Sequence, residues 1–98
     1  MSEKFEIIKE IYDVAVDRKS NPKEGSYTNY LFDKGIDKIC KKVGEEAAEV
    51  IIAAKNDNHD EIRYEVADLI YHITVLLVNQ GLSWEDICQE LINRRDKK

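Results

Sequence analysis

Apolar residues recur every three to four positions along most of this chain, which is the periodicity of amphipathic α-helices. The chain has only four Gly and one Pro among 98 residues. Because these residues commonly interrupt regular structure, their scarcity favours a few long helices over many short strands. The pattern predicts helices over residues 3–18, 27–34, 36–55 and 60–80, and a last helix that begins after Ser83. We therefore expect an all-α fold, an antiparallel helical bundle of four to five helices.

Residues at the helix ends support these bounds. Side chains suited to N-capping precede the helices: Ser2, Ser26, either Asn58 or Asp60, and Ser83. Gly35 and Gly81 follow the second and fourth helices, where glycine commonly ends a helix. The connection over residues 55–59 is short and polar, so the helices on either side of it are expected to be antiparallel neighbours.

The apolar faces indicate how these helices pack. The helix over 36–55 has one broad arc of apolar positions that we expect to face the core: Ile36, Ile39, Cys40, Val43, Ala47, Val50, Ile51 and Ala54. In the short second helix, Tyr27, Tyr30 and Leu31 share one side, and its aromatic residues are expected to pack inside rather than to stack on a ligand. The helix over 60–80 is apolar on two sides, which predicts a central helix or one at a subunit interface.

Composition and charge narrow the class of protein. The chain is 43% hydrophobic and 36% charged, as in folded soluble proteins. A formal net charge of −5 disfavours binding to nucleic acid or to an anionic membrane. A small domain buries a limited fraction of its surface, so we expect a homodimer or a higher homo-oligomer.

The cysteines and the absence of targeting signals indicate a compartment. Cys40 and Cys88 lie far apart and form no CxxC motif, so both are expected to be reduced core residues. No signal peptide and no long apolar span are apparent, which predicts a cytoplasmic protein.

Acidic residues lie at matched distances on either side of the turn between the two long helices. Glu49 and Glu65 each lie eight positions from Asp57, and Glu46 and Asp68 each lie eleven. Side chains at i and i+3 share a helix face, and packed helices run about 8–10 Å apart. The four carboxylates are therefore expected to meet in two facing pairs. Two such charges about 4 Å apart repel by about 4 kcal/mol at an effective dielectric constant near 20, so this arrangement predicts a bound cation.

The oxygen ligands indicate which cation binds and which substrate group it contacts. An all-oxygen set favours Mg²⁺ first and Mn²⁺ second over zinc, and Mg²⁺ sites commonly receive phosphate oxygens. The same face continues into three lysines that predict a phosphate-binding surface: Lys38, Lys41 and Lys42. Glu45 lies about 100° around the helix from Glu46 and is the candidate for activating water, with direct metal ligation as the alternative. His72 on the acidic flank is interpreted as a hydrogen-bonded helix residue.

These stretches resemble a known family. Gly25-Ser26-Tyr27-Thr28, Leu31-Phe32-Asp33-Lys34-Gly35, Lys41-Lys42-Val43-Gly44-Glu45-Glu46-Ala47 and Tyr64-Glu65-Val66-Ala67-Asp68-Leu69 resemble the phosphoribosyl-ATP pyrophosphohydrolase family of the all-α NTP pyrophosphatase (MazG-like) superfamily. The resemblance spans about residues 5–95. Because nothing in the sequence precedes it, we expect one domain over residues 1–98, without the phosphoribosyl-AMP cyclohydrolase domain to which some members are fused.

The resemblance implies an activity. Members hydrolyse the α–β phosphate bond of 1-(5-phosphoribosyl)-ATP to give phosphoribosyl-AMP and pyrophosphate, the second step of histidine biosynthesis, with Mg²⁺ and as a homodimer or larger assembly. The carboxylates would hold the metal against the triphosphate, and the lysines would stabilise the departing pyrophosphate.

Two other interpretations use the same residues. A house-cleaning NTP or dNTP pyrophosphatase of the same superfamily would share the acidic cluster, but the cluster alone would not require the segment over residues 25–35. A non-catalytic helical interaction module would leave the acids as a solvated face. Acidic residues at mirror-image distances across a short turn favour a metal site over that solvated face.

Overall fold

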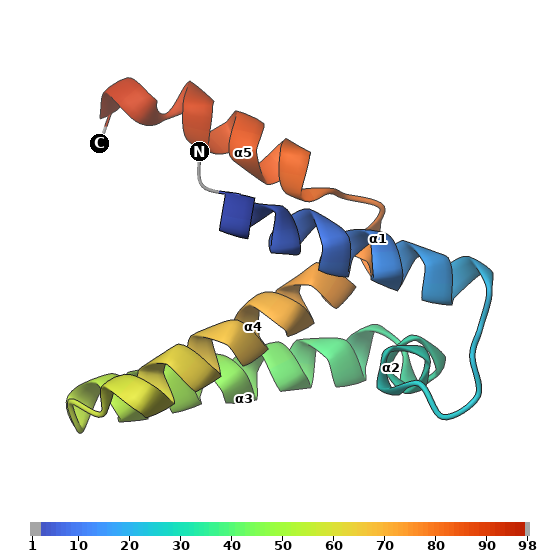
Figure 1. The fold of residues 1–98 in the computed structure, drawn as a ribbon, viewed down its shortest axis with the longest axis horizontal. Helices are drawn as coiled ribbons and strands as arrows, with labels where there is room; N and C mark the ends of the chain where they lie inside the picture. The colour runs from blue at the N-terminus through green and yellow to red at the C-terminus, as the bar shows by residue number, and fades with distance from the viewer. Residues whose placement is uncertain (1–2, 98) are drawn as a thin grey trace.

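The computed structural model describes residues 3–97, and within them the fold is all-α with no strand (Figure 1). The helices are η1 (Glu3–Phe5), α1 (Glu6–Ser20), α2 (Tyr27–Lys34), α3 (Ile36–Lys55), α4 (His59–Gln80), α5 (Trp84–Asn93) and η2 (Arg95–Lys97). The predicted fold class is confirmed, and α2 and α3 have the predicted bounds. Ser2, the predicted cap of the first helix, lies outside the described residues.

Three of the predicted N-caps form in the structure. The Ser26 side chain accepts a hydrogen bond from the backbone N–H of Asn29, and Asn58, rather than Asp60, accepts one from Glu61. Ser83 and Asp86 form a reciprocal capping box at the start of α5. These bonds satisfy N–H groups that have no partner within the helix.

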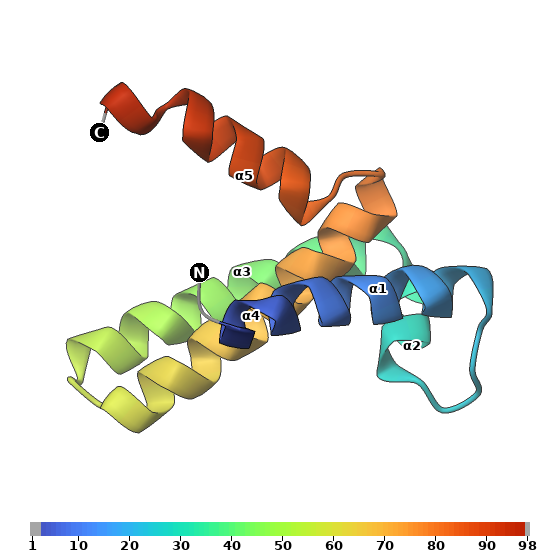
Figure 2. The same ribbon diagram turned by 45° about the horizontal axis from the view of Figure 1, so that its top comes forward.

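The two long helices, α3 and α4, form an antiparallel pair. α1 packs across α4, α2 lies at the end of the pair where α3 begins, and α5 folds back next to α1 (Figures 1 and 2). Trp84 at the start of α5 donates a hydrogen bond to the Thr74 hydroxyl at 3.0 Å. Asp57 in the α3–α4 turn adopts a left-handed conformation with φ 52°, which Asp tolerates better than most residues.

A small hydrophobic core lies where α2, α3 and the C-terminal half of α4 meet. Leu31, Ile39 and Val75 are fully buried there. The Asn29 side chain fixes α2 to the preceding segment, because it donates to the Arg18 carbonyl and accepts from the Lys23 N–H. The prediction that the fourth helix is central is confirmed, since α4 packs against α1, α2 and α3.

The prediction for the core face of α3 is wrong in part. The buried residues of this helix are Ile39, Glu46 and Ala53, whereas Ile36 and Ile51 are 40% and 62% exposed. α3 therefore packs on α4 through a face rotated towards the acidic residues. The periodicity correctly identifies apolar positions on α3. It does not show whether another helix of the chain covers them or whether they stay exposed on the surface.

Two further packing predictions are wrong. Tyr27 and Tyr30 are 45% and 41% exposed, and only Leu31 of that trio is buried. Cys40 and Cys88 are free thiols on the surface rather than core residues.

No helix in the range 3–97 is by itself long and apolar enough to cross a bilayer, although α4 and α5 pass by length and composition when joined, across a bend of 100°.

Candidate active site

Three of the four predicted ligands converge between α3 and α4. Glu46 and Glu49 from α3 and Glu65 from α4 each offer one carboxylate oxygen, and these oxygens lie within 4.8 Å of one another. The antiparallel turn around Asp57 brings them together. Two helices thus supply three oxygen donors to one point, which is the arrangement that the sequence spacing predicts.

Two oxygens of this group are buried without a partner. Glu46 is only 4% exposed, and within the described part of the chain its Oε2 atom and Oε1 of Glu65 accept no hydrogen bond. An uncompensated buried carboxylate oxygen costs several kcal/mol in order of magnitude. A hard divalent cation is the ligand that satisfies such oxygens, so the donor set fits Mg²⁺ or Mn²⁺.

The electrostatics of these carboxyl groups also favour a bound positive charge. A hydrogen bond with Glu49 raises the pKa of Glu65 to about 7, with burial and the charge of Glu49 acting in the same direction. Burial, followed by the charges of Asp68 and Glu49, raises the pKa of Glu46, and Lys42 offsets this only in part. Without a cation the cluster therefore tends to retain a proton near neutral pH.

Asp68 lies beside this group. Its charge raises the pKa of both Glu46 and Glu65, although its carboxylate is not among the three that converge within 4.8 Å. Asp68 therefore acts on the cluster through its charge, and the facing of Glu46 and Asp68 as a second pair stays a prediction.

Two hydrogen bonds link the backbone of Asp68 to Tyr27 on α2 through His72. Nδ1 of His72 lies 2.8 Å from the backbone carbonyl of Asp68, and because a carbonyl only accepts, Nδ1 donates. Nε2 is then free to accept from the Tyr27 hydroxyl at 3.1 Å. His72 is 3% exposed, so its predicted role as a hydrogen-bonded helix residue is confirmed. The sequence spacing places His72 one turn after Asp68, but no local signal indicates the contact with Tyr27.

The predicted phosphate-binding and water-activating residues are more dispersed. The Lys42 ammonium lies 3.5 Å from carboxylate oxygens of both Glu45 and Glu46. Lys41 is exposed, and Lys38 lies over the ring of Tyr30; among the described residues, neither forms an ion pair with a carboxylate. Glu45 is exposed and lies outside the converging group. The structure thus brings only Lys42 and Glu45 next to the acidic cluster.

The sequence of this chain is similar to those of known proteins. A family model described as phosphoribosyl-ATP pyrophosphohydrolase matches residues 6–95. The chain is 59% identical over 93 residues to the phosphoribosyl-ATP pyrophosphatase of Clostridium novyi, covering 95% of this chain and 84% of that protein. It is 60% identical over 87 residues to the protein of the same name from Limosilactobacillus fermentum, covering 89% of this chain and 82% of that protein.

Longer proteins match as well. The chain is 65% identical over 89 residues to the histidine biosynthesis bifunctional protein HisIE of Thermoanaerobacter pseudethanolicus, covering 91% of this chain and 41% of that protein. It thus spans less than half the length of this bifunctional relative and most of the length of the shorter ones. The family that the sequence resembles is confirmed over nearly the whole chain: this protein belongs to the phosphoribosyl-ATP pyrophosphohydrolase family.

Proposed function

We propose that this chain hydrolyses the α–β phosphate bond of 1-(5-phosphoribosyl)-ATP, giving phosphoribosyl-AMP and pyrophosphate as a step of histidine biosynthesis. The observation that supports this most is the pair of unpartnered, buried carboxylate oxygens of Glu46 and Glu65 between α3 and α4, in a chain of this family. A nucleotide is the small-molecule partner. Neither nucleic acid nor a membrane is part of the proposal.

The proposed cofactor is Mg²⁺, with Mn²⁺ as a substitute. Glu46, Glu49 and Glu65 would hold it, and Asp68 would add a fourth carboxylate from α4. When bound, the ion supplies positive charge that offsets the charge of the polyphosphate chain and increases the acidity of water.

The chain's own residues then divide the remaining tasks. Glu45 is proposed to accept the proton of the attacking water, whose oxygen bonds to the α-phosphorus as the bond to the α–β bridging oxygen breaks. Lys42 is proposed to stabilise the pyrophosphate that leaves with the electron pair. The distance of 3.5 Å from its ammonium to carboxylate oxygens of both Glu45 and Glu46 supports this role. Lys38 and Lys41, on the same helix, are proposed to bind substrate phosphate as well.

A homodimer or larger homo-oligomer is part of the proposal. Among residues 3–97, thirteen large hydrophobic side chains are exposed, whereas seven hydrophobic residues are buried. Ile51 and Ile52 at the end of α3 and Tyr64 on α4 are each more than half exposed, which is costly for a lone domain. Sedimentation velocity tests this, and a monomer that persists at all concentrations would refute it.

The substrate is tested by measuring pyrophosphate release from phosphoribosyl-ATP and from a panel of dNTPs with Mg²⁺. We expect phosphoribosyl-ATP to be hydrolysed fastest, and Glu46→Gln or Asp68→Asn to lower kcat by orders of magnitude. Glu90→Gln on α5 is the matched control, because that carboxylate is exposed and pairs only with Arg94 among the described residues. Faster turnover of any dNTP, or wild-type activity in both site variants, would overturn the proposal.

A further inference from the structure

Two tyrosines form an exposed aromatic surface on α2. Tyr27 and Tyr30 stack with ring centroids 5.9 Å apart and planes 20° from parallel, and both are more than 40% exposed. Large aromatic side chains normally bury most of their area. A stacked pair left open to solvent presents π-faces and edges on which a ring-containing ligand can lie.

This surface is continuous with the carboxylate site. The Tyr27 hydroxyl bonds His72, which in turn bonds the backbone of Asp68. Burial raises the pKa of Tyr27, and the charges of Lys42 and Glu46 also act on its hydroxyl. Tyr27 therefore lies next to the acidic cluster, and Tyr30 is linked to the cluster through its stacking on Tyr27.

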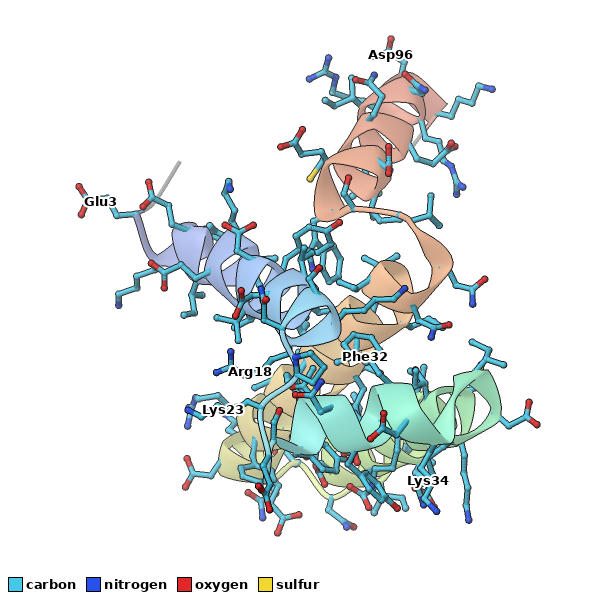
Figure 3. All side chains as sticks on the ribbon, turned by 90° about the vertical axis from the view of Figure 1, so that its right-hand side faces the viewer. Glu3, Arg18, Lys23, Phe32, Lys34 and Asp96 are labelled. Carbon is cyan, nitrogen blue, oxygen red and sulfur yellow. The ribbon has the colours of Figure 1, made fainter. Side chains whose placement is uncertain are left out.

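Two lysines lie at the far end of this surface. The ammonium groups of Lys34 and Lys38 lie 5.8 Å and 6.0 Å from the centroid of the Tyr30 ring. They come from the last turn of α2 and the first turn of α3, which meet at Gly35. Figure 3 shows Lys34 extending on the side of α2 that faces away from α5. In residues 3–97 neither lysine pairs with a carboxylate, so their charge is available to an anion.

The position of Lys38 separates it from the pyrophosphate end of the site. Lys42 already lies 3.5 Å from Glu45 and Glu46. Lys38 precedes Glu46 by eight residues, which is about 12 Å along a helix. One cationic group thus serves the carboxylate cluster, and a second, separate group lies beyond the tyrosines.

The substrate of the proposed function has two phosphate-bearing arms. The triphosphate belongs to the ribose of the adenosine part, whereas a single phosphate ends the second ribose, which is bonded to N1 of adenine. ATP has only the first arm. A second anion site, separate from the carboxylates that hold the triphosphate, would therefore distinguish phosphoribosyl-ATP from ATP.

We propose that Lys34 and Lys38, held around Tyr30, bind the 5-phosphate of the phosphoribosyl arm, and that Tyr27 and Tyr30 contact the rings between the two phosphate sites. This inference rests on the proposed function and deepens it, because it assigns specificity for the phosphoribosyl group to named residues. Charge-assisted hydrogen bonds to phosphate and contacts of sugar and base with aromatic rings are the interactions involved.

The test is the double variant Lys34→Met/Lys38→Met, which keeps much of each aliphatic stem and removes both charges. We expect KM for phosphoribosyl-ATP to rise at least about 10-fold, because a charged hydrogen bond contributes more than the free energy of one decade, with kcat within about twofold. ATP as a competing ligand should keep its inhibition constant, since it lacks the second phosphate. Lys55→Met at the end of α3 is the matched control and should change neither constant.

Direct binding of ribose 5-phosphate separates this inference from the proposed function. By NMR titration it should bind the wild-type protein and Lys55→Met, and bind the double variant at least about 10-fold more weakly. Tyr30→Ala should weaken it as well, with helicity unchanged by circular dichroism. Equal binding to wild type and double variant, no binding to the wild type, or equal losses for phosphoribosyl-ATP and ATP would overturn the inference. Failure of the wild type to hydrolyse phosphoribosyl-ATP would instead refute the proposed function.

Discussion

The two halves of α4 differ in what they bury. From residue 71 onwards the helix buries five side chains, namely His72, Thr74, Val75, Leu77 and Val78. Residues 59–70 contain no fully buried side chain, yet this half supplies Glu65 and Asp68 to the site. One continuous helix therefore joins a hydrophobic core to a cluster of like charges.

The two halves of α4 make opposite contributions to the free energy of unfolding. Val75 packs with Leu31 and Ile39, and burying each such side chain is worth about 1.5–3 kcal/mol. At the other end, burial raises the pKa of Glu46 and a hydrogen bond with Glu49 raises the pKa of Glu65, and the charges of neighbouring carboxylates act in the same direction. The ionised forms of these two groups therefore disfavour the folded state. The core half stabilises the fold, and the acidic half costs stability that the proposed cation would offset.

Leu31→Ala should have the largest effect on stability. The Leu31 side chain is 0% exposed and lies in the hydrophobic core. Truncation of such a leucine costs about 2–5 kcal/mol of unfolding free energy. Chemical denaturation measures the loss. Mn²⁺ affinity of the folded fraction should stay within about twofold of wild type; a comparable loss of metal affinity would show that the two regions are not separable.

Glu49→Gln should produce the opposite pattern. Even outer-shell changes cost about 10–100-fold in metal affinity, so removal of a proposed ligand should weaken Mn²⁺ binding by at least that much in an equilibrium titration. The unfolding free energy of the metal-free protein should stay the same or rise, because repulsion with Glu65 is removed. Glu90→Gln serves as the control here too. A variant that loses stability while it retains metal affinity would make Glu49 a structural residue.

Much of this division could be predicted from the sequence. Ser26, Asn58 and Ser83 mark helix starts through local hydrogen bonds, and these depend only on neighbouring residues. The facing of Glu49 and Glu65 followed from their equal distance from a short turn. Such features are local or are fixed by helix geometry, so pattern alone suffices.

Other features depend on which surfaces meet. Periodicity predicts that the apolar arc of α3 faces the core, but Ile51 is exposed and Glu46 is buried. Helical periodicity does not say which neighbour covers a face. The link from Tyr27 to His72 joins residues 45 positions apart. Only the docking of α2 on α4 creates it, so no spacing in the sequence could indicate it.

The pH dependence of stability offers a finer test of the acidic half. The pKa of Glu65 is about 7 in the folded metal-free protein against 4.5 for an ordinary Glu. The folded state therefore holds this proton more tightly, and the stability it contributes is present below pH 4.5 and is lost as pH rises through 7. We expect a lower melting temperature at pH 8 than at pH 5.5, a smaller difference in Glu65→Gln, and recovery of the wild type at pH 8 with Mg²⁺. An unchanged difference in Glu65→Gln would contradict this assignment.

Ser83→Ala should have the smallest effect on stability. It also tests whether α5 is coupled to the core half of α4 or to the acidic half. The Ser83 hydroxyl accepts from the Asp86 N–H at 3.2 Å, and the Ser83 N–H donates to the Asp86 carboxylate at 2.9 Å. Loss of such a cap costs about 1 kcal/mol, whereas Ser83→Thr should keep most of it. Because α5 packs on α1 and bonds Thr74 in the core half of α4, kcat per folded molecule should not change. If kcat fell in Ser83→Ala and returned in Ser83→Thr, α5 would have to belong with the acidic half of α4, and the boundary drawn within that helix would be in the wrong place.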